Sequence, residues 1–328
     1  MESRLQESGY PRIVTESDSR SRFVVNNSSD NPAVGGDSKS PKLMLISSDR
    51  TFYYVQHSQI LAVTNNAFAG LLLDNASSIT LPEPSSVLDL LIHLVYDISC
   101  IRLAPSLATS EATLNALIKY GILPRLHAVP GKPLYELLLF HAPHHPIAAY
   151  ALAAHYGLED AAVAISEHLL AYDVSRLSDA LVVQMGPVYF RRLLVMHQAR
   201  LSALKGIVLR PPGQHPPMPT CGGGGPAAGA SELGEAWAFA VAQLVWDASP
   251  GKPDCLCPGI RIRAYLTYTL AAPSHMFVSA PAGMSTDALR RAFESAGAAC
   301  GRCEACRAAL QRRIGEVCDA WAAVKRTI

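Results

Sequence analysis

Residues 42–73 read KLMLISSDRTFYYVQHSQILAVTNNAFAGLLL, and this stretch decides the fold of the first part of the chain. Two short apolar runs, Leu43–Ile46 and Thr51–Val55, stand on either side of the polar residues 47–50. Short apolar runs joined by a polar, turn-forming connection are typical of a β-hairpin. The stretch therefore predicts two paired strands.

The pattern changes to helical spacing directly after the hairpin. Apolar residues recur at steps of three and four from Ile60 to Leu72, which predicts a pair of helices. A third short strand is predicted at Ile79–Leu81, because Pro82 ends the run, and a further helix at Val87–Tyr96. The predicted order is hairpin, helix pair, strand and helix.

Length and composition predict a globular protein with room for about two domains, since the chain has 328 residues of which 49% are hydrophobic. The formal net charge of +1 creates no field that would attract nucleic acid or an anionic membrane. No apolar run approaches the length of a membrane-spanning helix, and the N-terminus MESRLQESGYPRIV is charged where a signal peptide would be apolar. We therefore expect a cytoplasmic or nuclear protein, with no membrane or nucleic-acid partner.

Composition along the chain predicts five segments. Residues 1–41 are rich in Ser, Asn, Asp and Gly, which predicts a disordered tail. The segments that follow are a mixed domain at 42–128, a helical extension at 129–210, a Pro/Gly-rich linker at 211–235 and a C-terminal helical region at 236–328. Without βαβ alternation in the second half, the fold class is α+β: a small three-stranded sheet with helices, followed by an all-helical region.

Local patterns predict the helices of the later segments. A helix is expected between an N-cap at Ser110 and a stop at Gly121, and a helical hairpin over residues 147–169 turns at Gly157. Gly186-Pro187 is expected to begin another helix. The apolar stripe of this helix is predicted at Phe190, Leu194, His197, Leu201 and Leu204. Two later helices are predicted from stripes of the same kind: the first at Trp237, Ala240, Val241 and Leu244, and the second at Leu310, Ile314, Val317 and Trp321.

Particular residues of the opening stretch resemble the BTB (POZ) domain, a protein-interaction module. That domain has an apolar strand, a His at the head of the next helix, a Leu four residues on and a Phe seven residues later, and this chain has Val55, His57, Leu61 and Phe68. It departs from the pattern at Asn65, where the family often has a small hydroxyl residue. The resemblance implies that His57 is structural.

The resemblance extends over most of the chain. The sequences HPIAAYALAAHYGLEDAAVAISEHLLAY, PPGQHPPMPTC and CEACRAALQRRIGEVCDAWAAVKRTI look like the body of fungal BTB-domain-containing proteins. Residues 251–283 interrupt this likeness between two continuous flanks. They are either an insertion of this lineage or an unspliced intron in the gene prediction, and the transcript sequence across the junction distinguishes the two.

The resemblance implies a function in protein–protein interaction without enzymatic activity. It implies a homodimer, and either an adaptor for a cullin-type ubiquitin ligase scaffold or a scaffold in transcription. Leu88, Leu91 and Leu94 are expected to divide between the core and the interface. No nucleophile elbow or paired-carboxylate pattern that would indicate a hydrolase is present in the sequence.

The cysteines are the place where chemistry is expected. The chain has eight, and three of them form the cluster CGRCEAC at residues 300–306. Zinc takes thiolate and imidazole ligands, and a Cys-x2-Cys pair supplies two of the four. We predict a structural zinc site of His215, Cys221, Cys303 and Cys306, with Cys300 as a substitute. Cys255 and Cys257 are discounted because they lie in the interrupting segment.

Two alternatives to a metal site remain at this point. Cys303 and Cys306 lead into an amphipathic helix, where they could pack as ordinary core residues. A redox-active pair is disfavoured because the surroundings lack a thioredoxin-like βαβ unit. Among functions, the alternative to an interaction protein is a metal- or thiol-dependent protein centred on Cys303 and Cys306.

The cluster His141, His144 and His145 is predicted to be a partly exposed loop.

Overall fold

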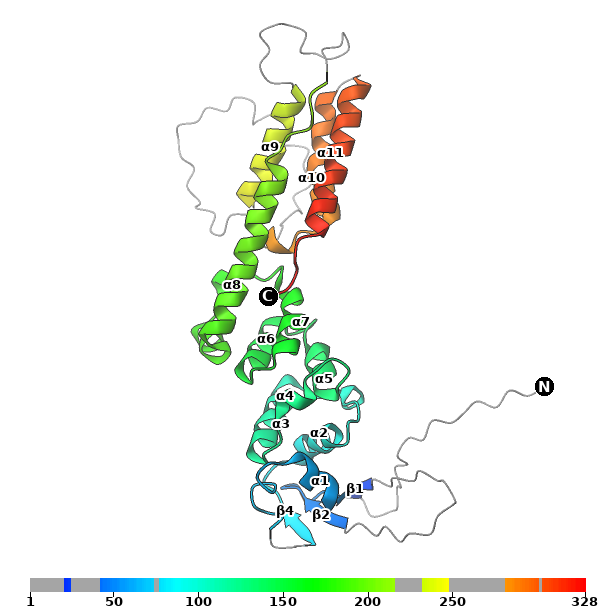
Figure 1. The fold of residues 1–328 in the computed structure, drawn as a ribbon, viewed down its shortest axis with the longest axis vertical. Helices are drawn as coiled ribbons and strands as arrows, with labels where there is room; N and C mark the ends of the chain where they lie inside the picture. The colour runs from blue at the N-terminus through cyan, green and yellow to red at the C-terminus, as the bar shows by residue number, and fades with distance from the viewer. Residues whose placement is uncertain (1–20, 25–41, 74–76, 216–231, 248–280, 301–302) are drawn as a thin grey trace, which may run out of the picture. The chain divides into compact units, whose positions relative to one another are not determined.

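The computed structural model of the chain describes residues 21–24, 42–73, 77–215, 232–247, 281–300 and 303–328 (Figure 1). The chain consists of two compact units, Met1–Ile165 and Ser166–Ile328. The first combines a sheet with helices and the second is helical in the residues described, so the predicted α+β class is confirmed. No helix in the described ranges is both long and apolar enough to cross a membrane.

The sheet of the first unit has the strand order β1-β3-β2-β4. The strands are β1 (Ser21–Val24), β2 (Lys42–Ile46), β3 (Phe52–Gln56) and β4 (Ser78–Thr80). Strands β2 and β3 are antiparallel, with Lys42 opposite Gln56 and Ile46 opposite Phe52. The predicted hairpin is therefore confirmed, and β4 is the predicted third strand, which returns parallel to β2.

Strand β1 corrects the prediction for the N-terminal segment. Residues 1–41 were predicted as a disordered tail, but Ser21–Val24 pair in parallel with β3 and add a fourth strand to the sheet. A strand of four residues has too few side chains to show a period-2 pattern, so composition alone missed it. The remaining residues of this segment lie outside the described part of the chain.

The polar turn of the hairpin is tied to the helix that follows the sheet. The Thr51 N–H donates to the Ser47 hydroxyl at 2.8 Å, which closes the turn. The Asp49 carboxylate accepts the Ser85 N–H at 3.2 Å, at the start of helix α2 (Ser85–Val95). Hydrogen bonds from the hydroxyls of Ser47 and Ser85 lower the pKa of Asp49 to about 2. The turn thus holds an anion at the positive end of a helix.

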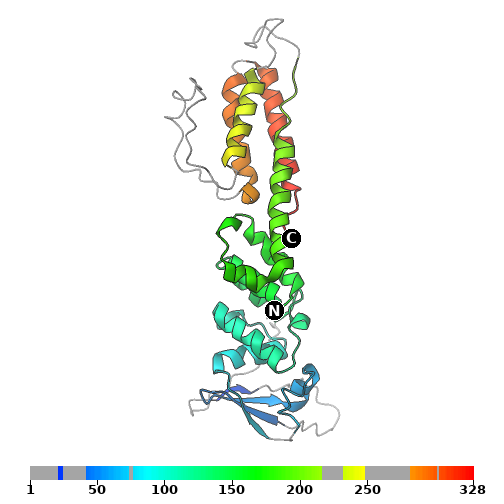
Figure 2. The same cartoon turned by 90° about the vertical axis from the view of Figure 1, so that its left-hand side faces the viewer.

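The remaining helices of the first unit gather on one side of the sheet (Figure 1, Figure 2). After α2 they are α3 (Leu107–Lys119), α4 (Pro124–His127), α5 (Pro133–His141), α6 (Pro146–His155) and α7 (Glu159–Ser166). Helices α6 and α7 are the predicted helical hairpin, which turns at Gly157. In α2 the side chains of Leu88, Leu91 and Leu94 are all fully buried. The expectation that they divide between core and interface was therefore wrong.

The predicted helix pair is reduced to one short helix. Helix α1 covers only His57–Val63, and the backbone of residues 67–69 has positive φ. The Phe68 N–H donates to the Thr64 hydroxyl at 3.0 Å, and the Ala69 N–H to the Asn66 side chain at 2.8 Å. These side chains compete with helical hydrogen bonds, so the apolar spacing continues while the helix ends. Ile60, Phe68 and Leu72 are nevertheless buried as predicted.

Helix α3 begins earlier than its sequence suggested. Ser106 is the N-cap, and its hydroxyl accepts the Thr109 N–H at 3.1 Å. Ser110, the predicted cap, lies inside the helix, where its hydroxyl is 3.0 Å from Nε2 of His141. Both positions are serines that precede helix-forming residues, so composition did not separate them. The predicted stop is confirmed, since Gly121 follows the helix with a φ of 70°.

Gly121 is predicted to be the most demanding glycine of the first unit. A Cβ at this position would lie 2.4 Å from Oδ1 of Asn65 and of Asn66. Gly121→Ala should therefore destabilise this unit by about 3 kcal/mol, from left-handed backbone strain and from displacement of the two side chains. Hydrogen exchange of peptides from α2 and α3, followed by mass spectrometry, measures the loss.

Gly157→Ala is the matched control for this prediction. Gly157 also has a positive φ of 63°, but a Cβ there meets nothing within 4 Å. Only backbone strain of about 1 kcal/mol is expected. Equal losses in the two variants would show that the contact with Asn65 and Asn66 does not constrain the turn.

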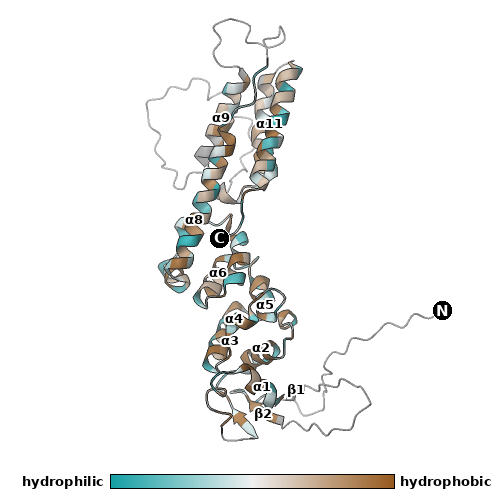
Figure 3. Ribbon diagram, in the orientation of Figure 1, coloured by the Kyte–Doolittle hydropathy of each residue, from teal (hydrophilic) through white to brown (hydrophobic). Residues whose placement is uncertain are grey.

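The second unit is a bundle in which the later part of α8 lies beside three other helices (Figure 1). The helices are α8 (Asp179–Val208), α9 (Glu232–Asp247), α10 (Thr286–Glu294) and α11 (Glu304–Ala322), with short 3₁₀ turns η2 (Glu167–Leu169), η3 (Val174–Arg176), η4 (Pro281–Gly283) and η5 (Ser295–Cys300). Hydrophobic and hydrophilic residues both occur along α11, as expected of a helix with one buried face (Figure 3).

Two of the three predicted stripes are confirmed. The predicted residues of α9 and of α11 are all buried. In α8, Gly186 has non-helical φ and ψ, so helical geometry resumes at Pro187 as expected. Its predicted stripe was displaced, however, because the buried side chains are Leu193, Met196, Arg200, Leu204 and Val208. Among the predicted residues only Leu204 is buried.

Two segments singled out from composition are partly described. Pro211–His215, from the predicted linker, continue from α8, and Glu232 begins α9. Of the interrupting segment 251–283, the last three residues form η4, and the side chain of Ala282 is buried. Residues 216–231 and 251–280 lie outside the described part of the chain.

Candidate metal site

Three of the four predicted metal ligands come together in the second unit. His215 ends the segment that follows α8, Cys303 is the N-cap of α11, and Cys306 lies in the first turn of α11. Nε2 of His215 is 3.0 Å from Sγ of Cys306 and 3.4 Å from Sγ of Cys303. All three ligand atoms lie within 4.8 Å of one another. The two sulfurs therefore converge on one imidazole nitrogen.

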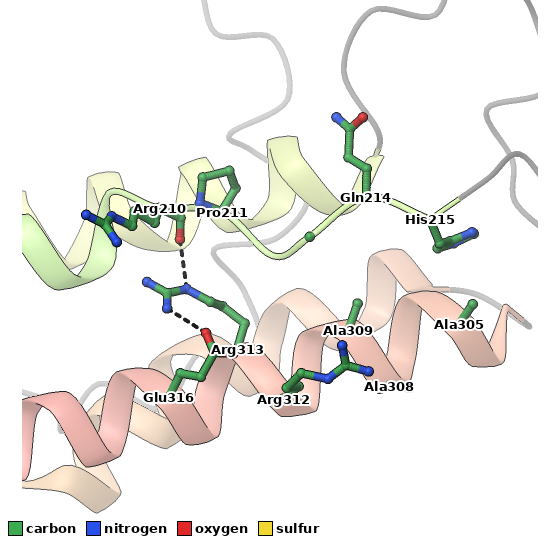
Figure 4. Close-up of a pocket in the computed structure, with 11 residues that line it drawn as sticks. Arg210, Pro211, Gln214, His215, Ala305, Ala308, Ala309, Arg312, Arg313 and Glu316 are labelled. Atoms are coloured by element: carbon green, nitrogen blue, oxygen red, sulfur yellow. Dashed lines mark hydrogen bonds and ion pairs between the residues drawn. The ribbon is translucent and has the colours of Figure 1, made fainter.

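The segment that carries His215 is held against α11 by Arg313. The Arg313 Nε–H donates to the carbonyl of Arg210 at 3.0 Å (Figure 4). Nη2 of Arg313 donates to the carbonyl of Ile207 at 2.6 Å. Nη1 of Arg313 also forms an ion pair with Oε2 of Glu316 at 2.9 Å, which orients the guanidinium. Pro212 is the one buried residue among residues 211–215. Polar contacts, more than apolar burial, thus hold this segment in place.

The N-terminus of α11 suits anionic sulfur. The Cys306 N–H donates to Sγ of Cys303 at 3.5 Å, so Cys303 caps the helix through its sulfur. The first turn of a helix carries the positive end of the helix dipole and stabilises negative charge. The side chains of Cys303 and Cys306 are only 1% and 5% exposed, whereas His215 is half-buried. The two sulfurs therefore lie in the interior of the helical unit, beside a histidine that is half-buried.

A cavity of about 540 Å³ lies between the same segment and α11. Its wall on the α11 side includes three alanines, Ala305, Ala308 and Ala309, and His215 lines its end near the cysteines (Figure 4). The small side chains of α11 leave room between the helix and the segment. Of the three candidate ligands, His215 is the one that lines this cavity.

The other cysteines lie elsewhere or outside the described ranges. Cys221, the fourth predicted ligand, and the discounted Cys255 and Cys257 are not in the described part of the chain. Cys300 is buried at the end of η5, but its sulfur is not part of the group of three. Cys100 and Cys318 are buried free thiols, and burial raises the pKa of both, that of Cys100 to about 12. Those two cysteines behave as core residues.

The histidine cluster of the first unit is not a ligand set. His141 is buried at the end of α5 and is bonded to Ser110, whereas His144 and His145 are exposed. The predicted partly exposed loop is therefore correct for His144 and His145 and wrong for His141. Burial, with the neighbouring His145 and His144, lowers the pKa of His141, which favours its neutral form. In the ranges described, His215, Cys303 and Cys306 form the one group of three candidate ligands.

No family model, no curated protein and no solved structure matches the chain. The class of protein is therefore defined by the fold and the donor atoms themselves. It is an α+β protein with a sheet-containing unit, followed by a helical unit in which one histidine and two cysteines converge. Arg313 holds the segment that carries His215 against α11, and no prediction from the sequence included this residue. No local pattern marks this role of the arginine, because the two carbonyls to which it donates, of Ile207 and Arg210, lie about a hundred residues away.

Proposed function

We propose that the chain is a non-enzymatic protein-interaction protein whose first unit is a BTB/POZ-like module. The order of elements supports this proposal. A hairpin of β2 and β3 leads into α1, β4 then returns parallel to β2, and α2 and α3 follow as packed helices. This order agrees with the one predicted for residues 42–96, except that a single helix, α1, takes the place of the predicted helix pair. Of the residues that carry the resemblance, Val55 and Phe68 are buried, His57 is half-buried and Leu61 is exposed.

The observation that carries the proposal is a group of exposed apolar side chains on two segments that hydrogen bonds tie together. The Asn65 N–H donates to the carbonyl of Gly121 at 2.9 Å, and the Asn66 amide donates to the carbonyl of Lys119 at 3.1 Å. On these segments and the end of α1, six side chains are between 38% and 73% exposed. They are Leu61, Leu71, Leu73, Ile118, Leu123 and Leu126, and we call them the junction surface.

Neighbouring polar groups have structural roles, which favours binding over catalysis. The Glu83 carboxylate accepts hydrogen bonds from Lys119, at 2.6 Å, and from the Tyr120 hydroxyl. Burial acts to raise the pKa of Glu83, but these bonds outweigh it and lower the pKa. The Tyr53 hydroxyl donates to Asp89 at 3.0 Å. These polar groups hold elements of the first unit together, whereas Ile118, next to Lys119 in the chain, is exposed to solvent.

The first partner to test is a second copy of the chain. Sedimentation of the full chain over a range of concentrations should show a dimer. Leu73→Glu and Leu126→Glu place a charge on exposed positions of the junction surface, so they should weaken self-association at least about tenfold without unfolding the unit. Val183→Glu, at an 80% exposed apolar position of the second unit, is the matched control and should leave the dimer unchanged.

Two outcomes contradict this proposal. A wild-type chain that stays monomeric at the highest soluble concentration excludes self-association. A dimer that resists both glutamates but is lost with Val183→Glu would move the interface to the second unit.

A cullin-type ligase scaffold is the other partner implied by resemblance, and titration of a purified cullin with the same variants tests it.

A further inference from the structure

We propose that His215, Cys303 and Cys306 bind a zinc ion, which fastens the segment after α8 to the N-terminus of α11. This role belongs to the second unit and is independent of the interaction proposed for the first. Three observations carry it: the chemistry of the donors, the distances between them, and the convergence of two sulfurs on one nitrogen.

The donors suit zinc in particular. Thiolate and imidazole ligands together select zinc over the hard cations calcium and magnesium, which prefer oxygen. Two thiolates also balance the charge of Zn²⁺, and the start of α11 stabilises them before any ion is bound. The group of three contains no carboxylate, the type of ligand that would indicate another metal.

The distances are close to those that a tetrahedral ion imposes. With Zn–S of about 2.3 Å and Zn–N of about 2.0 Å, a tetrahedral angle separates a nitrogen and a sulfur ligand by about 3.5 Å. The Cys303–His215 separation of 3.4 Å agrees with this value. The Cys306–His215 separation of 3.0 Å would lengthen by about 0.5 Å. Side-chain rotation alone provides such a shift.

Core packing and hydrogen bonding account less well for the arrangement. Cys303 and Cys306 belong to the apolar core of the bundle, as buried cysteines often do. Core packing does not require an imidazole beside them, however. One ring nitrogen has either one proton or one lone pair, so it can hydrogen-bond well to only one of the two sulfurs. A shared ion satisfies both sulfurs and the nitrogen together.

Three protein donors occupy three of the four positions of a tetrahedral ion. The remaining position faces a further ligand, either water or another side chain. Cobalt(II) replaces zinc in such sites and absorbs through its thiolate bonds, so its spectrum counts the sulfur ligands. Two sulfurs correspond to the three donors alone, and three sulfurs to a site that another cysteine completes.

Metal analysis of the purified full chain is the direct test. We expect about one zinc per chain in the wild type. Loss of an outer-shell partner already weakens metal binding by about 10-fold to 100-fold, so His215→Ala and Cys303→Ser should reduce zinc content at least about tenfold. Cys318→Ser is the matched control, since Cys318 is a buried free thiol on the same helix whose sulfur donates to the carbonyl of Thr286. It should retain zinc in full.

A second measurement protects the test against variants that fail to fold. A chelator should lower the melting temperature of the wild type, because binding of a ligand to the folded state stabilises it. The melting temperature of His215→Ala should be lower from the start and should not respond to the chelator. A wild type without zinc after reconstitution, or equal zinc loss in Cys318→Ser, would overturn the proposal.

Discussion

Phe293→Ala is expected to destabilise the second unit by about 3–5 kcal/mol. The Phe293 side chain is fully buried, and its ring stacks on that of Trp237 with centroids 3.9 Å apart. Trp237 also donates its indole N–H to the carbonyl of Val208 at 2.9 Å. Phe293 thus joins α10 to α9 and indirectly to the end of α8, and its removal leaves a cavity among three helices. All three tryptophans of the chain lie in the second unit, so their fluorescence during urea unfolding reports this loss specifically.

Phe239→Ala is the control for this prediction. Phe239 lies on α9 with a side chain that is 49% exposed, and its replacement should cost less than about 1 kcal/mol. If Phe293→Ala were as mild as Phe239→Ala, α10 could not pack against α9 as described. The comparison therefore also tests whether the chain after residues 251–280 re-enters the core of the bundle.

Elements with local signals could be predicted from the sequence. The hairpin, α2, and the stripes of α9 and α11 follow from periodicity that neighbouring residues carry by themselves. The second half of the predicted helix pair failed partly for a non-local reason. Thr64 donates its hydroxyl to the carbonyl of Tyr120 at 2.5 Å, and Asn65 and Asn66 bond to the same distant turn. Contacts with residues more than fifty positions away in the sequence thus join the local hydrogen bonds of Thr64 and Asn66 in ending a helix that its own spacing favoured.

The candidate site was predictable in its residues but not in its geometry. Spacing identified Cys303 and Cys306, and the composition of the Pro-rich segment identified His215. Which of the cysteines share a site with His215 depends on how α8 and α11 pack, and this packing includes polar contacts such as those of Arg313. The stripe predicted for α8 was wrong because Arg200, a charged residue, is among the buried residues of this helix, whereas the prediction relied on the spacing of apolar residues.

Replacement of that buried arginine is expected to have an effect of similar size. The Arg200 side chain is buried, and its Nε–H donates to the carbonyl of Ala282 at 2.7 Å. Its Nη1 donates to the carbonyls of Val324 and Lys325 at 3.0 and 2.9 Å, and the guanidinium lies 4.2 Å from the ring centroid of Trp321. Burial lowers the pKa of Arg200, but the group stays charged at neutral pH. Arg200→Ala leaves three carbonyls without this donor and should cost about 3–5 kcal/mol.

Arg200→Lys separates the hydrogen bonds of Arg200 from its charge, and Arg191→Ala is the control for both Arg200 variants. Arg200→Lys keeps the charge, but a compact ammonium lacks the planar fork that reaches three carbonyls, so an intermediate loss is expected. Arg191→Ala removes an exposed arginine from the same helix and should change the free energy of unfolding by no more than about 0.5 kcal/mol. Tryptophan fluorescence during urea unfolding measures all three variants. If Arg200→Lys retained the wild-type stability, charge alone would suffice. The guanidinium would then not be what joins α8, η4 and the residues that follow α11, because an ammonium could serve equally well.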